Sequence, residues 1–161
     1  MLKKVTFLLT LFTVVFISQL SAQYYKEAMR GYKNLNVRML PLDPDAIRNN
    51  VSSYMFTGKL ERELASIGAR LTDESKAEAY AVIDVELSDS QGIAYGYQIR
   101  IRFMRLIEPD KKAKKLKKIP ITVWETSRLG YSPKIALRNQ LEDNFEIVLD
   151  QFIREYSEAN N

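Results

Sequence analysis

The chain of 161 residues contains neither cysteine nor histidine. The missing histidine removes the usual general base near neutral pH and the commonest zinc ligand. The missing cysteine removes disulfides, thiol nucleophiles and Cys/His metal sites. Histidine-based triads, cysteine nucleophiles and zinc centres of these types are therefore excluded, and we expect no metal and no cofactor. Any catalysis would have to use carboxylates, lysine, serine or tyrosine.

The chain also lacks an apolar run of the roughly 20 residues that a membrane-spanning helix needs. Its longest run, residues 5–20, is shorter and contains polar residues. Two lysines precede this run and the small residues Ser21 and Ala22 follow it, which is the order of a cleavable secretory signal. We expect cleavage between Ala22 and Gln23, with an uncleaved anchor as the alternative. Lipoproteins carry their acylated cysteine where Gln23 stands, so we expect an unlipidated, periplasmic or secreted chain with no transmembrane anchor.

The excess of positive charge is confined to two short segments. Without the two lysines of the expected signal, the 24 basic residues fall to 22, against 20 acidic residues. The segment 108–118 holds six lysines and two acidic residues, so the rest of the mature chain has a net charge of −2. A nucleic-acid groove needs basic residues spread over a surface. We therefore expect no nucleic-acid partner, and secretion supports this exclusion.

The length bounds the domain organisation. Without residues 1–22, the chain has 139 residues, which is the size of one domain with a single core. We expect a signal peptide at 1–22, an N-terminal extension at 23–33 and a single α+β domain at 34–158.

Hydrophobic periodicity predicts the elements of this domain. Apolar and polar residues alternate in four segments, which predicts four strands. Asp43 and Pro44 mark a helix start, and it stays open whether Asn49 and Asn50 divide the helical segment that follows. Helical spacing predicts helices over about 52–67 and from Ser132 and Pro133 to about Tyr156. The predicted strands are 35–39, 81–87, 98–103 and 121–126.

The predicted order β-α-β-β-β-α gives a mostly antiparallel sheet of about four strands with two helices packed on one face. In the favoured register of the middle strands, Glu86 lies opposite Arg100 and Asp84 opposite Arg102. The next pairing sets Arg100 against Trp124. The lysine-rich segment then forms a hairpin loop.

This register puts Trp124, the only tryptophan, on the polar face of the sheet. An aromatic ring flanked by cations and hydroxyls can hold a sugar ring, a peptide or an anionic group. The structural alternatives are that Trp124 stacks on Arg100, or that a bulge turns it into the core. The candidate binding residues on this face are Gln98, Arg100, Arg102, Thr122 and Trp124.

Two loops are further candidates. Ile93 and Tyr95 lie between glycines, and if exposed they would contact a partner or a membrane edge. The alternative is that they fold back on the N-terminal tyrosines. Lysines in the hairpin loop would contact anionic lipid headgroups or an acidic partner, or simply form a solvated tip. These lysines are Lys111, Lys112, Lys114 and Lys115, followed by Lys117 and Lys118.

A resemblance joins several of these features. The signal, the helix end at Ile67-Gly68, the alternating strand from Ala79 to Leu87, and Val123-Trp124-Glu125 before a long terminal helix resemble small Gram-negative envelope lipoprotein domains. More distantly, they resemble the lipopolysaccharide-assembly lipoprotein and the N-terminal domain of TolB. The resemblance covers most of residues 34–156 and implies an envelope role, although Gln23 replaces the lipidated cysteine.

These features predict a non-catalytic envelope protein that binds or assembles with an envelope protein, a glycan or an anionic lipid headgroup. One alternative is a carboxylate-dependent hydrolase using Asp84 and Glu86, which lie about 7 Å apart on one strand face. Another is a structural subunit that assembles through sheet edges.

Overall fold

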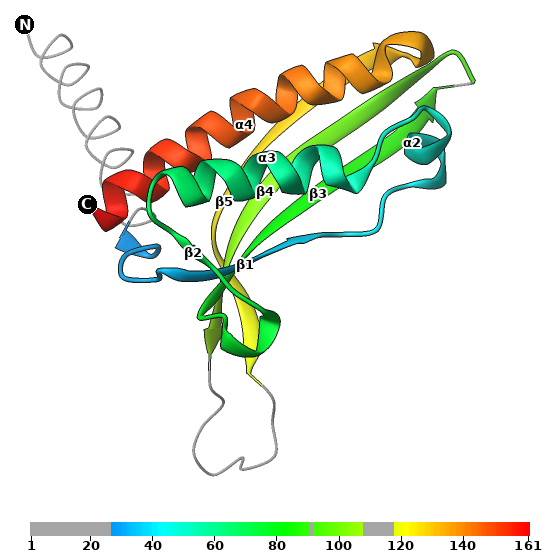
Figure 1. Cartoon of the computed structure of the whole chain (residues 1–161). Coiled ribbons are helices and arrows are strands. Elements are labelled where there is room, and N and C mark those ends of the chain that lie inside the picture. The colour runs from blue at the N-terminus through cyan, green and yellow to red at the C-terminus, as the bar shows by residue number, and fades with distance from the viewer. Residues whose placement is uncertain (1–26, 91, 108–117) are drawn as a thin grey trace, which may run out of the picture.

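The computed structural model describes residues 27–90, 92–107 and 118–161. The expected signal peptide and the lysines from 111 to 117 lie outside these residues. Within the described ranges, no helix is both long and apolar enough to cross a membrane. The chain forms an α+β fold in which the two longer helices lie side by side over one face of a twisted sheet (Figure 1).

Five strands form the sheet in the order β2-β1-β3-β4-β5. Strand β1 runs parallel to both β2 and β3, whereas β3, β4 and β5 form an antiparallel meander. The sheet is therefore mixed, and the predicted number of four strands is wrong by one. The bounds are β1 Asn34–Met39, β2 Arg70–Leu71, β3 Ala79–Ser90, β4 Ala94–Ile107 and β5 Ile119–Pro133.

The described helices are three α-helices and two short 3-10 helices, so the predicted number of two α-helices is also wrong. Their bounds are α2 Pro44–Arg48, α3 Ser53–Ser66, η1 Glu74–Lys76, η2 Lys134–Ala136 and α4 Leu137–Asn160. The predicted start at Asp43 is confirmed, because its carboxylate accepts a hydrogen bond from the Asp45 amide at 2.7 Å. Asn50, with φ of 60°, separates α2 from α3.

The break at Asn50 resets the phase of the helix that follows. The spacing of Ile47, Val51 and Tyr54 predicts one apolar stripe. Across the break, only Val51 is buried, whereas Ile47 and Tyr54 are 60% and 77% exposed. The core side of α3 consists of Phe56, Leu60 and Leu64.

The predicted apolar stripe of the last helix is confirmed, but its predicted ends are wrong. Ser132 and Pro133 belong to β5, and α4 begins only at Leu137 after η2. The Ser132 side chain is buried opposite Tyr95, and its hydroxyl donates to the Pro133 carbonyl instead of capping a helix. The stripe comprises Leu137, Leu141, Phe145, Val148, Phe152 and Tyr156, all buried.

The faces of β3 and β4 agree with the prediction, but their register differs by two residues. Asp84 lies opposite Arg100 rather than Arg102. The turn is tighter than predicted, since β3 continues to Ser90 and β4 resumes at Ala94. A shift of two keeps every side chain on its face, because the side-chain period of a strand is two.

The pairing of β4 with β5 departs further from the prediction. Phe103 pairs with Trp124 and Met104 with Thr122, so Val123 is an extra residue in β5. This β-bulge turns Trp124 to the helix side of the sheet, where Arg100 is not its neighbour. From Trp124 to Thr126, where the predicted strand ends, the side chains lie on the face opposite to the predicted one.

Aromatic rings fill the core between the sheet and α4. The Trp124 ring lies 5.2 Å from that of Phe152, measured between centroids. Phe103 lies 6.4 Å from Phe152 and 6.1 Å from Tyr156. The indole Nε1 of Trp124 donates to Glu155 Oε2 at 2.7 Å, so the polar atom of this buried ring is satisfied.

The segment before β1 packs against the end of α4. The Tyr156 hydroxyl donates to the Tyr32 carbonyl at 2.6 Å, and Asn160 Nδ2 donates to the Met29 carbonyl at 3.1 Å. Met29 is fully buried, and the Tyr32 ring packs edge-on against Phe103 with centroids 6.0 Å apart. Residues 27–33 thus contribute to the core of the domain.

The Tyr156→Phe variant tests this packing. Burial raises the pKa of Tyr156 to about 12, against about 10 in an unfolded chain. Between these pH values the unfolded chain ionises first, so the free energy of unfolding falls as pH rises. We expect Tyr156→Phe to lose about 1–2 kcal/mol at neutral pH and to show a shallower fall above pH 10, measured by urea denaturation. Tyr54→Phe, at an exposed position, is the control, and equal alkaline slopes in wild type and Tyr156→Phe would contradict the assignment.

Candidate functional site

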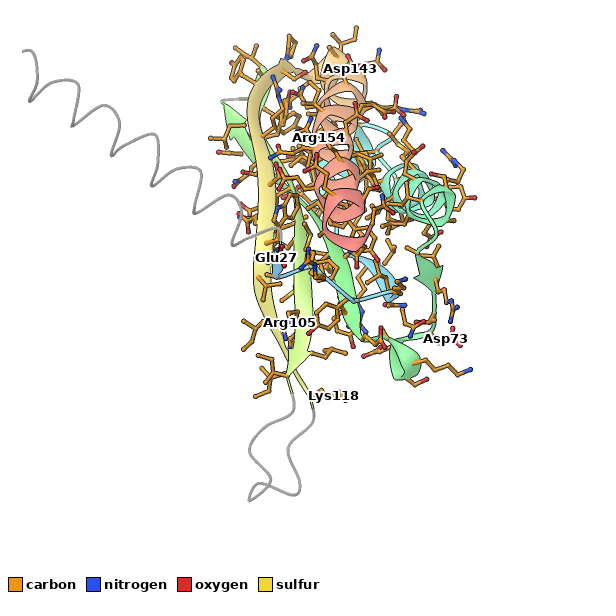
Figure 2. The ribbon with its side chains drawn as sticks, turned by 90° about the vertical axis from the view of Figure 1, so that its left-hand side faces the viewer. Glu27, Asp73, Arg105, Lys118, Asp143 and Arg154 are labelled. Carbon is orange, nitrogen blue, oxygen red and sulfur yellow. The ribbon has the colours of Figure 1, made fainter. Side chains whose placement is uncertain are left out.

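The sheet face away from α3 and α4 is here called the outer face. At one end, near η1, it carries a small apolar cluster of Ala77, Tyr80 and Val82, with Met104 and Leu106 packed against it. Beyond that cluster, no described helix lies over the outer face (Figures 1 and 2). Antiparallel sheets commonly leave one face in solvent, so the side chains on this face decide whether it can bind anything.

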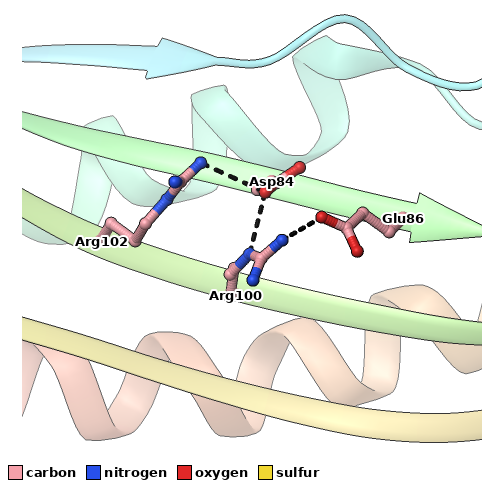
Figure 3. Close-up of polar contacts among 4 residues, drawn as sticks. All are labelled: Asp84, Glu86, Arg100 and Arg102. Carbon is pink, nitrogen blue, oxygen red and sulfur yellow. Dashed lines mark hydrogen bonds and ion pairs between the residues drawn. The ribbon is translucent and has the colours of Figure 1, made fainter.

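Four charged side chains occupy the middle of the outer face (Figure 3). Arg100 Nε donates to Asp84 Oδ2 at 2.8 Å, and Arg102 Nη2 donates to the same oxygen at 3.2 Å. Arg100 also bonds Glu86 through its Nη2. The predicted ion pairs of Asp84 with Arg102 and of Glu86 with Arg100 therefore form, as diagonal contacts in the shifted register.

The pKa of Arg100 reflects two opposing effects. Burial disfavours its charge, but the hydrogen bond and charge of Asp84, with the charges of Glu86 and Glu125, outweigh burial and raise the pKa. The four-residue network carries no net charge. Its arginines are engaged with carboxylates, which makes them weaker anion contacts than the sequence alone predicts.

The same network bears on the hydrolase alternative. Asp84 is only 6% exposed, and two guanidinium groups approach one of its oxygens. Glu86 is open, with 59% of its side chain exposed. A pair of catalytic carboxylates must both reach a substrate. The hydrolase alternative therefore stays a prediction, and Asp84, one of its two carboxylates, is enclosed by the arginines.

A shallow hollow of about 330 Å³ adjoins this network near the β3–β4 turn. It exists because Gly96 places no side chain on the outer face: an added Cβ would have only the Ser88 carbonyl oxygen within 4 Å, at 3.8 Å. Tyr131 lies opposite Gly96, and Leu129 lies opposite Gln98. The lining residues are Glu86, Leu87, Ser88, Gly96, Tyr97, Gln98, Leu129 and Gly130.

Two large apolar side chains stand beside the hollow. Leu129 is 77% exposed and Tyr131 is 63% exposed, and both belong to β5 on the outer face. Sequence reasoning missed them because it ended the last strand at Thr126. The alternation of Ser127, Leu129 and Tyr131 was the available signal.

The floor of the hollow is held in place by Tyr97. Its ring crosses β5 at Gly130, where an added Cβ would lie 2.2 Å from the ring atom Cζ. Asn144 Nδ2 of α4 donates to the Tyr97 hydroxyl at 2.7 Å. Burial raises the pKa of Tyr97, and the nearby charge of Arg128 acts in the opposite direction. Glycine at 130 is therefore required for the ring to pass.

The structure divides the predicted binding residues into three groups. Gln98, Arg100, Arg102 and Thr122 share the outer face. For Trp124, the place on the polar face is wrong and the alternative is confirmed: the bulge turns it into the core, where it is 4% exposed. Tyr95 is 2% exposed and lies on the helix side of β4, so the exposed alternative for this residue is wrong. Ile93 is 75% exposed. Lys111, Lys112, Lys114 and Lys115 lie outside the described residues.

Two other hollows lie apart from this network. One, of about 420 Å³, is lined mainly by apolar residues of the β1–α2 connection and the start of α3, among them Leu40 and Ile47. The other, of about 500 Å³, is polar and lies beside β2, with Asp73 and Lys76 in its lining. Across the described residues, no three acidic side chains come together as a metal site.

Comparisons with known proteins add little. No family model matches the chain, and no curated protein sequence matches it. A minor lipoprotein from Acinetobacter baumannii matches in structure with a TM-score of 0.36 and 15% identity, over 80% of this chain and 92% of its own. A hypothetical protein from Chlamydia trachomatis matches with a TM-score of 0.37 and 11% identity, over 76% and 98%.

The Asp84→Asn variant tests the charged network. It leaves Arg100 and Arg102 without their shared carboxylate in a partly buried setting, and we expect a loss of about 2–4 kcal/mol in the free energy of unfolding. Glu86→Gln removes the exposed partner and is the matched control, with an expected loss under about 1 kcal/mol. Urea denaturation measures both, and similar losses for the two variants would contradict the central role of Asp84.

Proposed function

We propose that this chain is a non-catalytic protein of the bacterial envelope and that the hollow beside Gly96 binds an envelope glycan. The observation that supports this most is that exposed Leu129 and polar Gln98 and Glu86 line one open hollow. The exposed Tyr131 lies opposite Gly96, next to this lining. Large apolar side chains exposed together on a monomer commonly mark an interaction site. Residues 1–22, whose sequence resembles a secretory signal, support the proposed location in the envelope.

The chemistry of the hollow favours a neutral, hydroxyl-rich ligand. A sugar ring has one apolar face and a polar edge, which suits the exposed Tyr131 ring and Leu129 beside amide and carboxylate groups. Gln98 offers both donors and acceptors, and Glu86 accepts. Arg100 is already paired with Asp84 and Glu86, which disfavours an anionic headgroup at this place.

A glycan titration tests the proposal. The protein, expressed from its full sequence and labelled with 15N, would be titrated with soluble, uncharged glycan fragments, namely oligomers of N-acetylglucosamine, and separately with phosphatidylglycerol vesicles. We expect fragment-dependent amide shifts at Gly96, Gln98 and Gly130, and no vesicle effect at these amides. Gly96→Val fills the hollow without removing a polar group and should weaken fragment binding at least about tenfold.

Matched variants separate the hollow from general surface effects. Tyr131→Ser should weaken binding, whereas Tyr54→Ser, which removes a more exposed tyrosine from α3, should leave it unchanged. Shifts that map to α2 or α3, or an unchanged affinity in Gly96→Val, would overturn the proposal. Vesicle-induced shifts around Gly96 would instead favour a lipid surface and overturn the choice of a glycan.

A further inference from the structure

Among the described residues, strand β5 is an edge strand, with one side of its backbone not paired to another strand. It is the last strand of the sheet and has 15 residues, and within the described part of the chain β4 is the only strand that pairs with it. Figure 2 shows it at the border of the sheet, with α4 beside it. Free edges present unpaired N–H and C=O groups that readily pair with another strand. Natural monomers usually shorten, twist or charge such an edge.

The features that would hinder pairing of this edge with another strand lie near the two ends of β5. Pro120 and the bulge at Val123 interrupt the first part, and Pro133 ends the last. Between them, residues 124–132 contain no proline and no bulge. The charges in this stretch are Glu125 on the outer face and Arg128 on the helix side. The stretch is long enough for a stable strand pair.

We propose that β5 pairs antiparallel with β5 of a second copy of this chain, with the twofold axis at Leu129, so that the two sheets form one continuous sheet. This proposal goes beyond the glycan site and does not rest on it. In such a dimer, residue 129 faces its own copy across the axis. Residue 127 faces 131, and residue 128 faces 130.

The register follows from the side chains. An axis at Arg128 would set the two copies of this cation face to face, which is destabilising. An axis at Ser127 would set Leu129 against Glu125. An axis at Gly130 would pair only residues 127–133. The axis at Leu129 pairs residues 125–133, places the two exposed leucines together and avoids like charges.

This register also accommodates Arg128. A charge pointing to the core side of an edge strand normally blocks pairing. Here Arg128 of each copy would meet Gly130 of the other, where there is no side chain and the Tyr97 ring crosses the strand. A guanidinium group over an aromatic ring is favourable. The guanidinium group of Arg128 can therefore be accommodated over Gly130 and the Tyr97 ring of the other copy.

Helix α4 adds a second layer to the interface. It lies over β4 and β5, and its Gln151 and Glu155 bond β5 through Thr126 and Trp124. Two such helices would lie about two strand spacings apart, roughly 10 Å, which is a normal distance for packed helices. Ile147, one turn before Gln151 and 47% exposed, lies on the flank that would face the other copy.

Cysteine cross-linking tests the axis directly, because the chain has no cysteine of its own. Directly opposed residues have Cα atoms about 4.5–5.5 Å apart, within reach of a disulfide. Expressed from the full sequence and mildly oxidised, Leu129→Cys should form covalent dimers, and a mixture of Ser127→Cys with Tyr131→Cys should do so more than either alone. Tyr54→Cys, exposed on α3, is the control and should stay monomeric.

Charge exchange gives an independent test in solution. Leu129→Lys and Leu129→Glu should each raise the dimer dissociation constant at least about tenfold in sedimentation, and their mixture should restore the dimer. Circular dichroism shows whether the variants remain folded. A wild-type chain that sediments as a monomer at all accessible concentrations would overturn the proposal. So would a dimer that Leu129→Cys does not cross-link, or a monomer whose β5 amides respond only to an added partner peptide.

Discussion

One extra residue in β5, Val123, determines on which face of the sheet the following side chains of this strand lie. Because side chains alternate along a strand, a single inserted residue reverses the faces of all that follow. Trp124 and Thr126 therefore turn toward α4, and Leu129 and Tyr131 turn outward. The aromatic core, the hydrogen bond from Trp124 to Glu155 and the exposed apolar side chains of the outer face all depend on this one bulge.

The bulge also explains why the candidate site lies away from the predicted one. Trp124 lies on the other side of the sheet, and Arg100 and Arg102 are paired with carboxylates of β3, so no free cationic face surrounds the tryptophan. The exposed apolar groups lie further along β5, beside Gly96. The outer face thus has a polar centre without net charge and exposed apolar side chains beside it. Strand β5, which carries these apolar side chains, is also an edge strand of the sheet.

Local periodicity predicts much of this fold. The alternation over 81–87 and 98–103 and the stripe from Leu137 to Tyr156 identify strands and a helix, because one face of each element is buried. The alternation of side chains predicts which face each residue occupies, but it does not predict the offset between two strands. Asp84 therefore lies on the predicted face and contacts the predicted arginine, although its strand register differs from the prediction by two residues. Strand β2 has two residues, too few for any pattern.

The candidate site was harder to predict than the fold. The sequence pattern of residues 121–124 is compatible with a strand that has a bulge and with one that has none, because both arrangements leave apolar residues on the core face. Gly130 weakens the strand signal where Leu129 and Tyr131 lie. The tertiary contacts of Tyr97 with Gly130 and Asn144 explain why a glycine is required there.

The fluorescence of Trp124 tests the central claim most directly, because it is the only tryptophan in the chain. With the bulge at Val123, the native protein should show blue-shifted emission that iodide hardly quenches, and unfolding in urea should shift the emission to longer wavelength. An emission already typical of water-exposed indole in the native protein, quenched by iodide as strongly as in urea, would place Trp124 on the outer face and contradict the account.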